Sequence, residues 1–169
     1  MKSYIKVLLV VLSITVSGCA YLGDQNSTMV TKPAKPPMAI GDISPQQLLS
    51  NYPAFNEEFK AFSLSNEETE LVRAWPVNLR VDAYFGTWCH DSVREVPRLL
   101  KALSTQVDIN LIGLDYSKSE PLGRELQVNI KFTPTFVVYL NNAVIGRIVE
   151  RPKVSLVLDI DDLIKKEAG

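Results

Sequence analysis

The pattern of apolar and polar residues predicts four strands in the second half of the chain. Residues 79–85 alternate in part, and residues 107–114 are apolar through their C-terminal half, as a buried parallel strand would be. Residues 136–140 and 144–149 predict two further strands, joined by Asn141-Asn142-Ala143. Since asparagine tolerates the positive φ that hairpin turns require, these last two strands should form a hairpin.

Helices are predicted between and after these strands. A helix over residues 91–103 carries apolar residues at helical spacing and contains Pro97, which should kink it. A short helix over residues 120–127 and a C-terminal helix over residues 154–166 follow. Strands joined by a helical crossover run parallel, and a hairpin adds antiparallel strands. The order therefore predicts an α/β fold with a mixed central sheet flanked by helices.

Two more helices are predicted before the first of these strands, as an N-terminal helical extension. Ser44-Pro45-Gln46-Gln47 combines a capping serine, a proline at the first helical position and a glutamine at the third. The helix that follows should run to about Phe59, with an interruption at Pro53. Ser65-Asn66-Glu67-Glu68 is a second capping box, and Pro76 ends the helix that it opens. We therefore place the folded domain at residues 44–169.

Residues 1–18 have the features of a lipoprotein signal peptide. Lys2 and Lys6 are basic, and the apolar run over residues 7–16 is too short to span a bilayer. The following Val16-Ser17-Gly18-Cys19 resembles the lipobox of bacterial lipoproteins. That resemblance implies cleavage before Cys19 and lipid on this cysteine. An ordinary signal peptide with a chance cysteine is the alternative.

Residues 19–43 should form an extended tether that holds the domain away from the membrane. The segment is polar and contains the proline-rich stretch at residues 32–37. Ala20 follows the lipidated cysteine where aspartate would favour the inner membrane, so the lipoprotein resemblance implies the outer membrane. We expect a protein of the cell envelope, anchored by its N-terminal lipid on the periplasmic side of the outer membrane.

Composition and charge exclude one class of partner. The chain of 169 residues is 46% hydrophobic and 22% charged, which is ordinary for a globular protein. Its 18 basic and 19 acidic residues nearly cancel. A nucleic-acid-binding protein usually shows a basic patch or stripe, so no nucleic acid is expected as a partner.

The candidate chemistry centres on Cys89, which lies between a predicted strand and a predicted helix. The first free N–H groups of a helix and the positive end of its dipole stabilise a thiolate at this position. Ser92 stands three residues later, where a redox pair would have its second cysteine. The chain has two cysteines, and lipid on Cys19 would leave Cys89 as the single free thiol of the mature protein.

Four features together resemble the thioredoxin fold family, over residues 78–166. They are Trp88-Cys89 at the start of a helix with Ser92 in the second-cysteine position, Pro97 within that helix, Thr133-Pro134 before the hairpin, and the terminal helix. The resemblance implies a thioredoxin-like fold with a cis peptide bond before Pro134. It places Thr133 beside the thiol, where its backbone can pair with an extended substrate segment. A simple turn before the strand is the alternative for Thr133-Pro134.

Three departures from the family pattern argue against a self-sufficient disulfide reductase. Ser92 replaces the resolving cysteine, so the chain is a monothiol CxxS variant. Ala83 stands where many thioredoxins bury an acid, and the neighbouring Asp82 has the opposite strand parity. The glycine that usually follows the last strand is missing around residues 150–152.

A site with one thiol can attack a disulfide and form a mixed disulfide, but it has no second thiol that could resolve this bond and release the partner. Ser92 cannot attack the mixed disulfide, although its hydroxyl can donate a hydrogen bond to the Cys89 thiolate. Release would need an external thiol, such as glutathione as co-substrate, or a second thiol on the partner. No resident cofactor is expected.

The neighbours of the thiol should tune it. Protonated His90 would favour the thiolate, whereas Asp91 would oppose it or would simply be the first-turn acid of the helix. Trp88 should flank the thiol on the surface, with partial core packing as its other role. His90 is the single histidine and no second free cysteine accompanies it, so no structural zinc site is expected.

Two functions from different classes fit these residues. The first is thiol–disulfide exchange, as an oxidoreductase or isomerase that lacks a resolving cysteine, with envelope proteins that carry thiols or disulfides or with small thiols. The second is a redox-inactive binding or chaperone-like module that has kept the fold. A metal- or haem-assembly factor is a third reading, and it rests on fold analogy alone.

Overall fold

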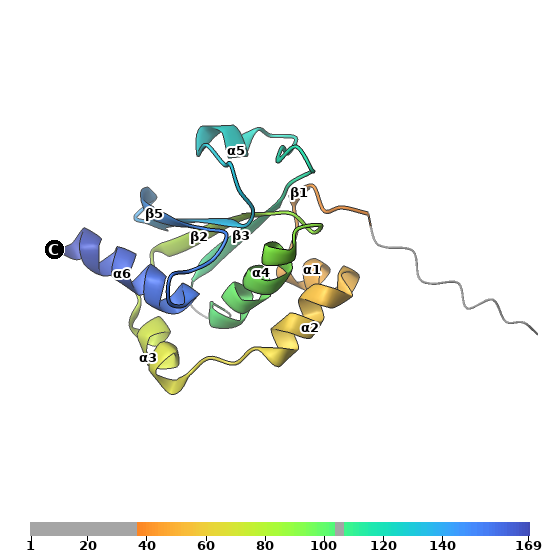
Figure 1. Ribbon diagram of the computed structural model, residues 1–169. Coiled ribbons are helices and arrows are strands. Elements are labelled where there is room, and N and C mark those ends of the chain that lie inside the picture. Colours follow the sequence, from red (N-terminus) through yellow and green to blue (C-terminus); the bar gives the residue numbers. More distant parts are fainter. Residues whose placement is uncertain (1–36, 104–106) are drawn as a thin grey trace, which may run out of the picture. The chain divides into compact units, whose positions relative to one another are not determined.

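The computed structural model describes residues 37–103 and 107–169 (Figure 1). The predicted signal peptide, Cys19, Ala20 and the tether up to residue 36 lie outside the described residues. No helix in the described ranges has the length and apolar character needed to cross a membrane.

A five-stranded mixed sheet forms the centre of the fold, in the order β1-β3-β2-β4-β5. The strands are β1 (Gly41–Asp42), β2 (Leu79–Phe85), β3 (Asp108–Gly113), β4 (Thr135–Leu140) and β5 (Ala143–Val149). β2 and β3 run parallel, whereas β4 is antiparallel to both β2 and β5. The predicted α/β fold with a mixed sheet is confirmed.

The last pair of strands forms the predicted hairpin. Asn141 and Asn142 have φ values of 52° and 65°, the left-handed conformation that asparagine tolerates. The turn is two residues long, and Ala143, expected in the turn, is the first residue of β5.

Strand β1 lies inside the segment that the sequence predicts to be a tether. Gly41 pairs with Gly113 of β3 and adopts a φ of 81°, and Ala39 just before it is buried. A Cβ at Gly113 would lie 2.4 Å from the Ala39 carbonyl oxygen, so only glycine allows this close approach. The ordered domain thus begins before residue 44. A two-residue strand is too short to produce a periodic pattern, and for that reason the sequence does not reveal it.

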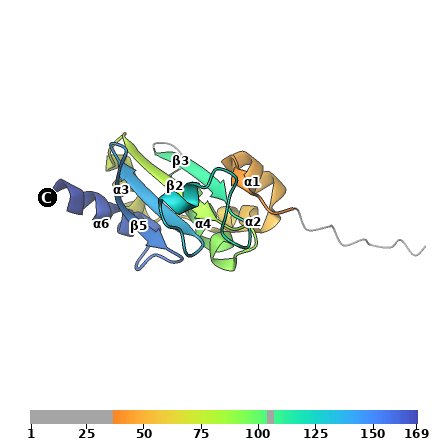
Figure 2. The same ribbon diagram turned by 90° about the horizontal axis from the view of Figure 1, so that it is seen from above.

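Helices cover both faces of the sheet. They are α1 (Pro45–Asn51), α2 (Pro53–Ala61), α3 (Asn66–Ala74), α4 (His90–Ala102), α5 (Arg124–Gln127) and α6 (Leu156–Ala168). Figure 1 shows α5 on one side of the sheet and the other helices beneath its opposite face, and Figure 2 looks onto the sheet from the α5 side.

Local sequence signals explain most of the helix boundaries. Both predicted capping boxes are present: the hydroxyls of Ser44 and Ser65 each accept the backbone N–H three residues later, at 3.1 Å. The helical conformation is interrupted at Tyr52, immediately before Pro53, as predicted, and this divides the segment into α1 and α2. The predicted helix over residues 120–127 is shorter than expected, because Gly123 in the left-handed conformation precedes a four-residue α5.

Two clusters of buried side chains fill the faces of the sheet. The larger cluster lies on the α4 side and includes Phe85 of β2, Leu99 of α4 and Phe136 of β4. The N-terminal helices contribute Leu48 and Phe55 to it, so the predicted extension is part of the same core. The smaller cluster lies on the opposite face, toward α5, and its members are Tyr84, Ile112, Leu114, Ile130, Val137 and Tyr139.

The extension should therefore be required for stability. Phe55 is 1% exposed and its ring meets that of Phe85 edge-on, with centroids 5.9 Å apart. Phe55→Ala should lower the free energy of unfolding by about 3–5 kcal/mol, because it leaves a cavity beneath α2. Urea unfolding followed by circular dichroism measures this loss.

Val77→Ala is the matched control, because Val77 is 92% exposed. It should change the free energy of unfolding by less than about 0.5 kcal/mol. A loss of less than about 1 kcal/mol in Phe55→Ala would show that the N-terminal helices add little to the core.

Candidate functional site

Cys89 is the residue that caps the N-terminus of α4. Its backbone N–H donates to the Gly86 carbonyl and its own carbonyl accepts from the N–H of Val93, both at 3.0 Å. The Cys89 side chain makes no capping hydrogen bond, so its sulfur does not bind the free N–H groups at the start of the helix. Instead, the thiol donates to the Thr133 carbonyl oxygen at 3.1 Å, across 44 positions of sequence. Cys89 is partly exposed and is the free cysteine of the described residues.

The loop that supplies the Thr133 carbonyl is held from several sides. The Thr133–Pro134 peptide bond is cis, as the family resemblance implies. The Pro134 carbonyl accepts the N–H of Glu150 at 2.7 Å, and the Thr135 hydroxyl donates to the Phe132 carbonyl at 2.7 Å. Thr133 itself is 5% exposed. The loop therefore presents its backbone to the sulfur from a fixed position.

Ser92 forms a hydrogen bond with the backbone of the loop between β2 and α4. It is completely buried, and its hydroxyl oxygen accepts the Gly86 backbone N–H at 3.2 Å. No hydrogen bond joins Ser92 to the Cys89 sulfur among the described residues. In the protonated site the thiol is itself a donor, and it uses the Thr133 carbonyl. Ser92 thus fastens the loop between β2 and α4.

Trp88, the residue before Cys89, is partly buried. Its indole N–H donates to the Leu114 carbonyl at 3.1 Å, and its ring lies against Tyr116 with centroids 5.1 Å apart. The indole also covers Gly86, where a Cβ would lie 2.5 Å from the ring. Glycine at position 86 is therefore what allows the ring to lie over the loop.

Asp91 is neutralised by two arginines. Its carboxylate lies 2.9 Å from Arg94 and 3.0 Å from Arg151, which belongs to the loop after β5. Burial opposes ionisation of this carboxyl, but the hydrogen bonds from Arg151 and Arg94 outweigh it and hold the pKa of Asp91 below its ordinary value. Asp91 therefore ties the loop after β5 to the start of α4, while His90 is exposed beside it.

The position of the missing glycine has an unusual backbone. Glu150 adopts a φ of 60°, in the left-handed region that glycine prefers. Its N–H donates to Pro134, and the next residue, Arg151, holds Asp91. A non-glycine residue thus occupies a backbone conformation that glycine adopts more readily.

No acid lies on the same face of β2 as Ala83. Ala83 is fully buried in the larger cluster, whereas Asp82 points to the opposite face, as its parity predicts. There, Asp82 contacts Arg80 at 2.6 Å and Asn110 at 2.7 Å. The Asp82 carboxylate is therefore bound by Arg80 and Asn110 on the face of the sheet opposite to Ala83.

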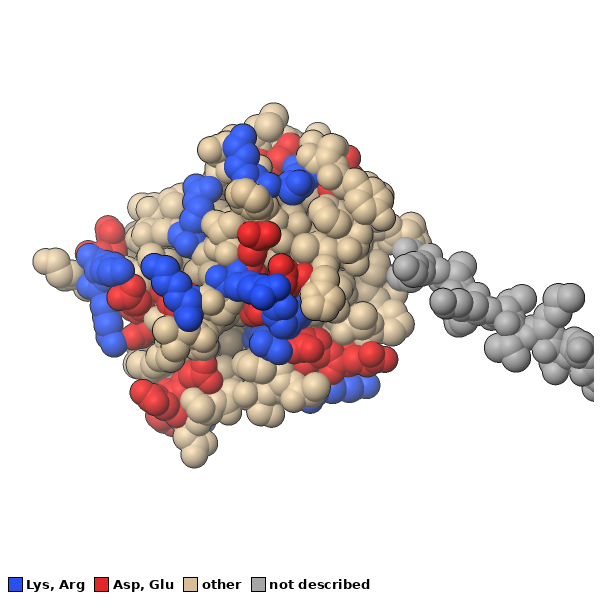
Figure 3. All heavy atoms as spheres, viewed as in Figure 1, with Lys and Arg blue, Asp and Glu red and all other residues tan. Residues whose placement is uncertain are grey.

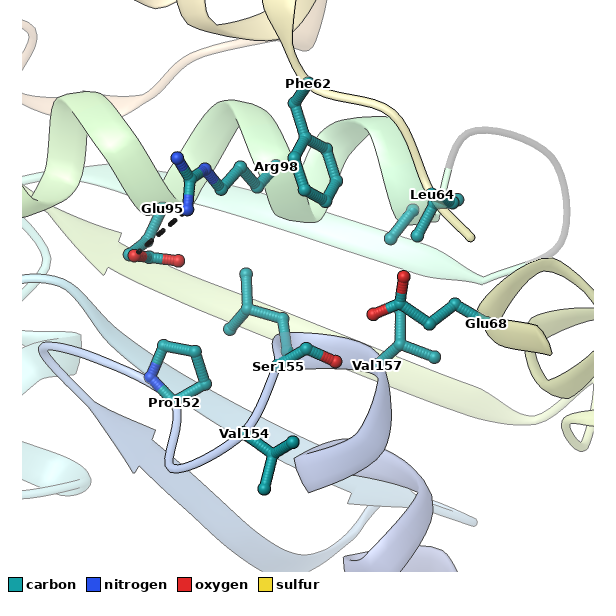
Figure 4. A pocket seen from close by; sticks show the side chains of 11 residues that line it. Phe62, Leu64, Glu68, Glu95, Arg98, Pro152, Val154, Ser155 and Val157 are labelled. Atoms are coloured by element: carbon teal, nitrogen blue, oxygen red, sulfur yellow. Dashed lines mark ion pairs between the residues drawn. The ribbon is translucent and has the colours of Figure 1, made fainter. Parts of the chain in front are cut away.

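A buried acid that the sequence does not reveal lies on α4 instead. Glu95 is 3% exposed and accepts from Arg94 at 2.6 Å. It also borders a cavity of about 230 Å³ between α4 and the start of α6. Figure 4 shows its ion pair with Arg98, at 3.9 Å, on one wall and Pro152 and Val154 on another. Glu95 stands between apolar residues of the helix, and no local pattern in the sequence distinguishes its buried carboxylate from an exposed one.

Charged groups of the two signs are mixed on the surface that carries α4 and α6 (Figure 3). In the described ranges, no group of three or more His, Cys, Asp or Glu side chains is arranged to hold a metal ion.

Comparison with solved structures finds proteins that share the fold of this chain at low sequence identity. The chain is similar to PA1234, a protein of unknown function from Pseudomonas aeruginosa, with a TM-score of 0.53 and 17% identity over 72% of this chain and 84% of that one. It is also similar to an HIV epitope-scaffold, with a TM-score of 0.52 and 16% identity over 72% and 84% of the two chains. Thioredoxin f2 from Chlamydomonas reinhardtii has a TM-score of 0.37 and 22% identity over 48% and 74%. No protein-family model matches the chain, and no curated protein matches its sequence.

The fold is thioredoxin-like. The mixed sheet flanked by helices, the cysteine at the start of α4 and the cis peptide bond before Pro134 are those that the resemblance implies.

The contacts of Asp91 predict a pH-dependent contribution to stability. Because its pKa is lowered in the folded state, the contribution is present above the ordinary aspartate pKa and is lost as pH falls through the lowered value. Asp91→Asn should lower the free energy of unfolding by about 0.5–1 kcal/mol at pH 7, as is typical of partly exposed ion pairs. The difference from wild type should shrink between pH 5 and the acid limit, which urea unfolding at several pH values measures.

Glu57→Gln is the control, since Glu57 is exposed on α2 and forms no ion pair with any described residue. A destabilisation by Asp91→Asn that stays constant down to the acid limit would contradict the arginine contacts.

Proposed function

We propose that this chain is a cell-envelope lipoprotein that carries out thiol–disulfide exchange through a single nucleophilic cysteine, Cys89. The observation that carries the proposal is the placement of the Cys89 sulfur. It lies at the N-terminus of α4, partly exposed, 3.1 Å from the Thr133 carbonyl and next to the cis-proline loop. The N-terminal end of a helix favours the thiolate, which is the attacking form.

The reaction is an exchange that leaves the total number of disulfides unchanged. The Cys89 thiolate attacks one sulfur of a disulfide on the partner, and a new bond forms between the two sulfurs. The partner's own S–S bond breaks, and its second sulfur leaves as a thiolate that takes up a proton. The product is a mixed disulfide between Cys89 and the partner.

Completion of the reaction depends on a thiol from elsewhere. Ser92 is buried and its oxygen holds the Gly86 N–H, and a hydroxyl cannot displace a thiolate from a disulfide. A small thiol such as glutathione, or a second thiol on the partner, attacks the mixed disulfide and regenerates Cys89. Glutathione is in this account a co-substrate.

The location follows from the N-terminal sequence. The signal-like residues 1–18, the lipobox-like residues 16–19 and Ala20 support lipid on Cys19 and an anchor on the periplasmic side of the outer membrane. The partners are then envelope proteins with thiols or disulfides, and the membrane is contacted through the lipid. Lipidation also removes Cys19 from disulfide chemistry, so Cys89 acts alone.

A redox-inactive binding module is the second candidate. Ser92 in place of a resolving cysteine and Ala83 in place of a buried acid favour it, because both remove parts of the reductase machinery. The surface around Trp88 and Tyr116 would then bind a partner without a covalent step.

Trapping in cells separates the two candidates. Cells that make the full chain are quenched with acid and then with an alkylating agent, and adducts are resolved without reductant. The wild-type protein should carry adducts that disappear on reduction and are missing from Cys89→Ser. Ser92→Cys should carry far fewer, because a restored second thiol attacks the mixed disulfide and releases the partner.

Two results would contradict thiol–disulfide exchange. The first is an adduct pattern that is the same in wild type and Cys89→Ser. The second is a cellular phenotype of the deletion that Cys89→Ser fully restores, which would favour the binding module.

A further inference from the structure

A hollow of about 450 Å³ is lined by residues of the loop between β2 and α4, which leads to Cys89, and by residues of the N-terminal extension. Thr87, Trp88 and Tyr116 form its wall on the side of the thiol. Tyr52 and Ala54, at the start of α2, belong to the opposite wall. The thioredoxin-like part of the chain therefore supplies only half of this hollow, and the extension supplies the rest.

Three of the four polar side chains on its walls, those of Tyr52, Thr87 and Trp88, form hydrogen bonds within the protein. The Tyr52 hydroxyl donates to the Pro37 carbonyl at 2.7 Å, and burial raises its pKa, so it stays neutral. The Thr87 hydroxyl oxygen accepts a hydrogen bond from the Ala39 N–H at 3.3 Å. The indole N–H of Trp88 donates to the Leu114 carbonyl oxygen at 3.1 Å. None of the residues that line the hollow carries a charge.

This lining selects an apolar occupant. A charged or strongly polar group would lose its water here and find no ionic partner, which costs free energy. An aromatic or branched aliphatic group would instead contact the rings of Trp88 and Tyr116. The volume is within the range of about 300–1,000 Å³ that is usual for ligand pockets, and one large side chain fills part of it.

Three of the lining residues lie close to Cys89 along the chain. Thr87 and Trp88 immediately precede the cysteine, and Val93, another lining residue, follows it by one helical turn through the bond from its N–H to the Cys89 carbonyl. Once the sulfurs are joined, a residue next to the partner's own cysteine would lie close to these lining residues. Tyr116, 68% exposed, forms part of the wall that such a residue would cover.

We propose that this hollow is a specificity pocket for a large apolar side chain adjacent to the reactive cysteine of the partner. The inference rests on the proposed exchange at Cys89 and names the class of partner that it favours: thiols or disulfides flanked by an aromatic or aliphatic residue. The N-terminal helices thus contribute to substrate choice as well as to the core.

The test compares two probes on the purified full chain. They are the symmetric disulfides of N-acetyl-cysteinyl-phenylalanine amide and of N-acetyl-cysteinyl-glycine amide. Cys89 attacks one sulfur, retains one peptide and releases the other as a thiol. The rate of adduct formation, mapped to Cys89 by peptide mass, should be at least about tenfold higher for the phenylalanine probe.

Ala54→Trp is the variant that fills the hollow from an exposed position of α2. It should bring the ratio of the two rates close to one. Ala61→Trp, at the other end of the same helix and outside the lining residues, is the matched control and should keep the wild-type ratio.

The outcomes separate this inference from the function on which it rests. Equal rates for both probes in wild type, or an unchanged preference in Ala54→Trp, would overturn the pocket and leave exchange at Cys89 intact. If neither probe reacts at Cys89 in a folded protein, the proposed function fails and the pocket fails with it.

Discussion

The register between β2 and β4 is the constraint on which the rest of the site depends. Tyr84, near the end of β2, pairs with Thr135, the first residue of β4. The C-terminal end of β2, which leads to Cys89, therefore lies beside the N-terminal end of β4, which follows Thr133. The Cys89 sulfur and the Thr133 carbonyl oxygen are 3.1 Å apart as a result. A slip of one residue would turn every side chain of β4 to the other face of the sheet and remove this contact.

Around that contact, charged groups hold the elements that border the thiol. Arg151, in the loop after β5, contacts Asp91 at 3.0 Å, and Arg94 joins Asp91 to the buried Glu95. Arg98, further along α4, forms an ion pair with Glu58 of α2 at 2.7 Å. The network runs along α4 and connects the loop after β5 with the N-terminal extension. It leaves Cys89 beside groups whose charges are balanced within the protein.

Local signals in the sequence were sufficient for much of the fold. The two capping boxes, the break at Pro53 and the Asn141-Asn142 turn each depend on a few neighbouring residues, and they are present as predicted. The contacts that shape the site are instead long-range. Arg151 lies 60 residues from Asp91, and no local pattern reports this pair. The same holds for the burial of Glu95 and for the hollow that the extension forms with Trp88. The hydrogen bond from the Gly86 N–H to the Ser92 hydroxyl, over six residues, is a further contact that the sequence pattern did not indicate.

The central claim is that the fold makes Cys89 a better nucleophile than it would be in an unstructured chain. The most direct measurement is the rate at which Cys89 exchanges with a small uncharged disulfide at pH 7, in the folded chain and in the same chain unfolded in urea. Adducts are mapped to Cys89 by mass. The helix N-terminus predicts a several-fold faster reaction in the folded chain, despite partial burial. A rate in the folded chain equal to or below that of the unfolded chain would contradict the claim.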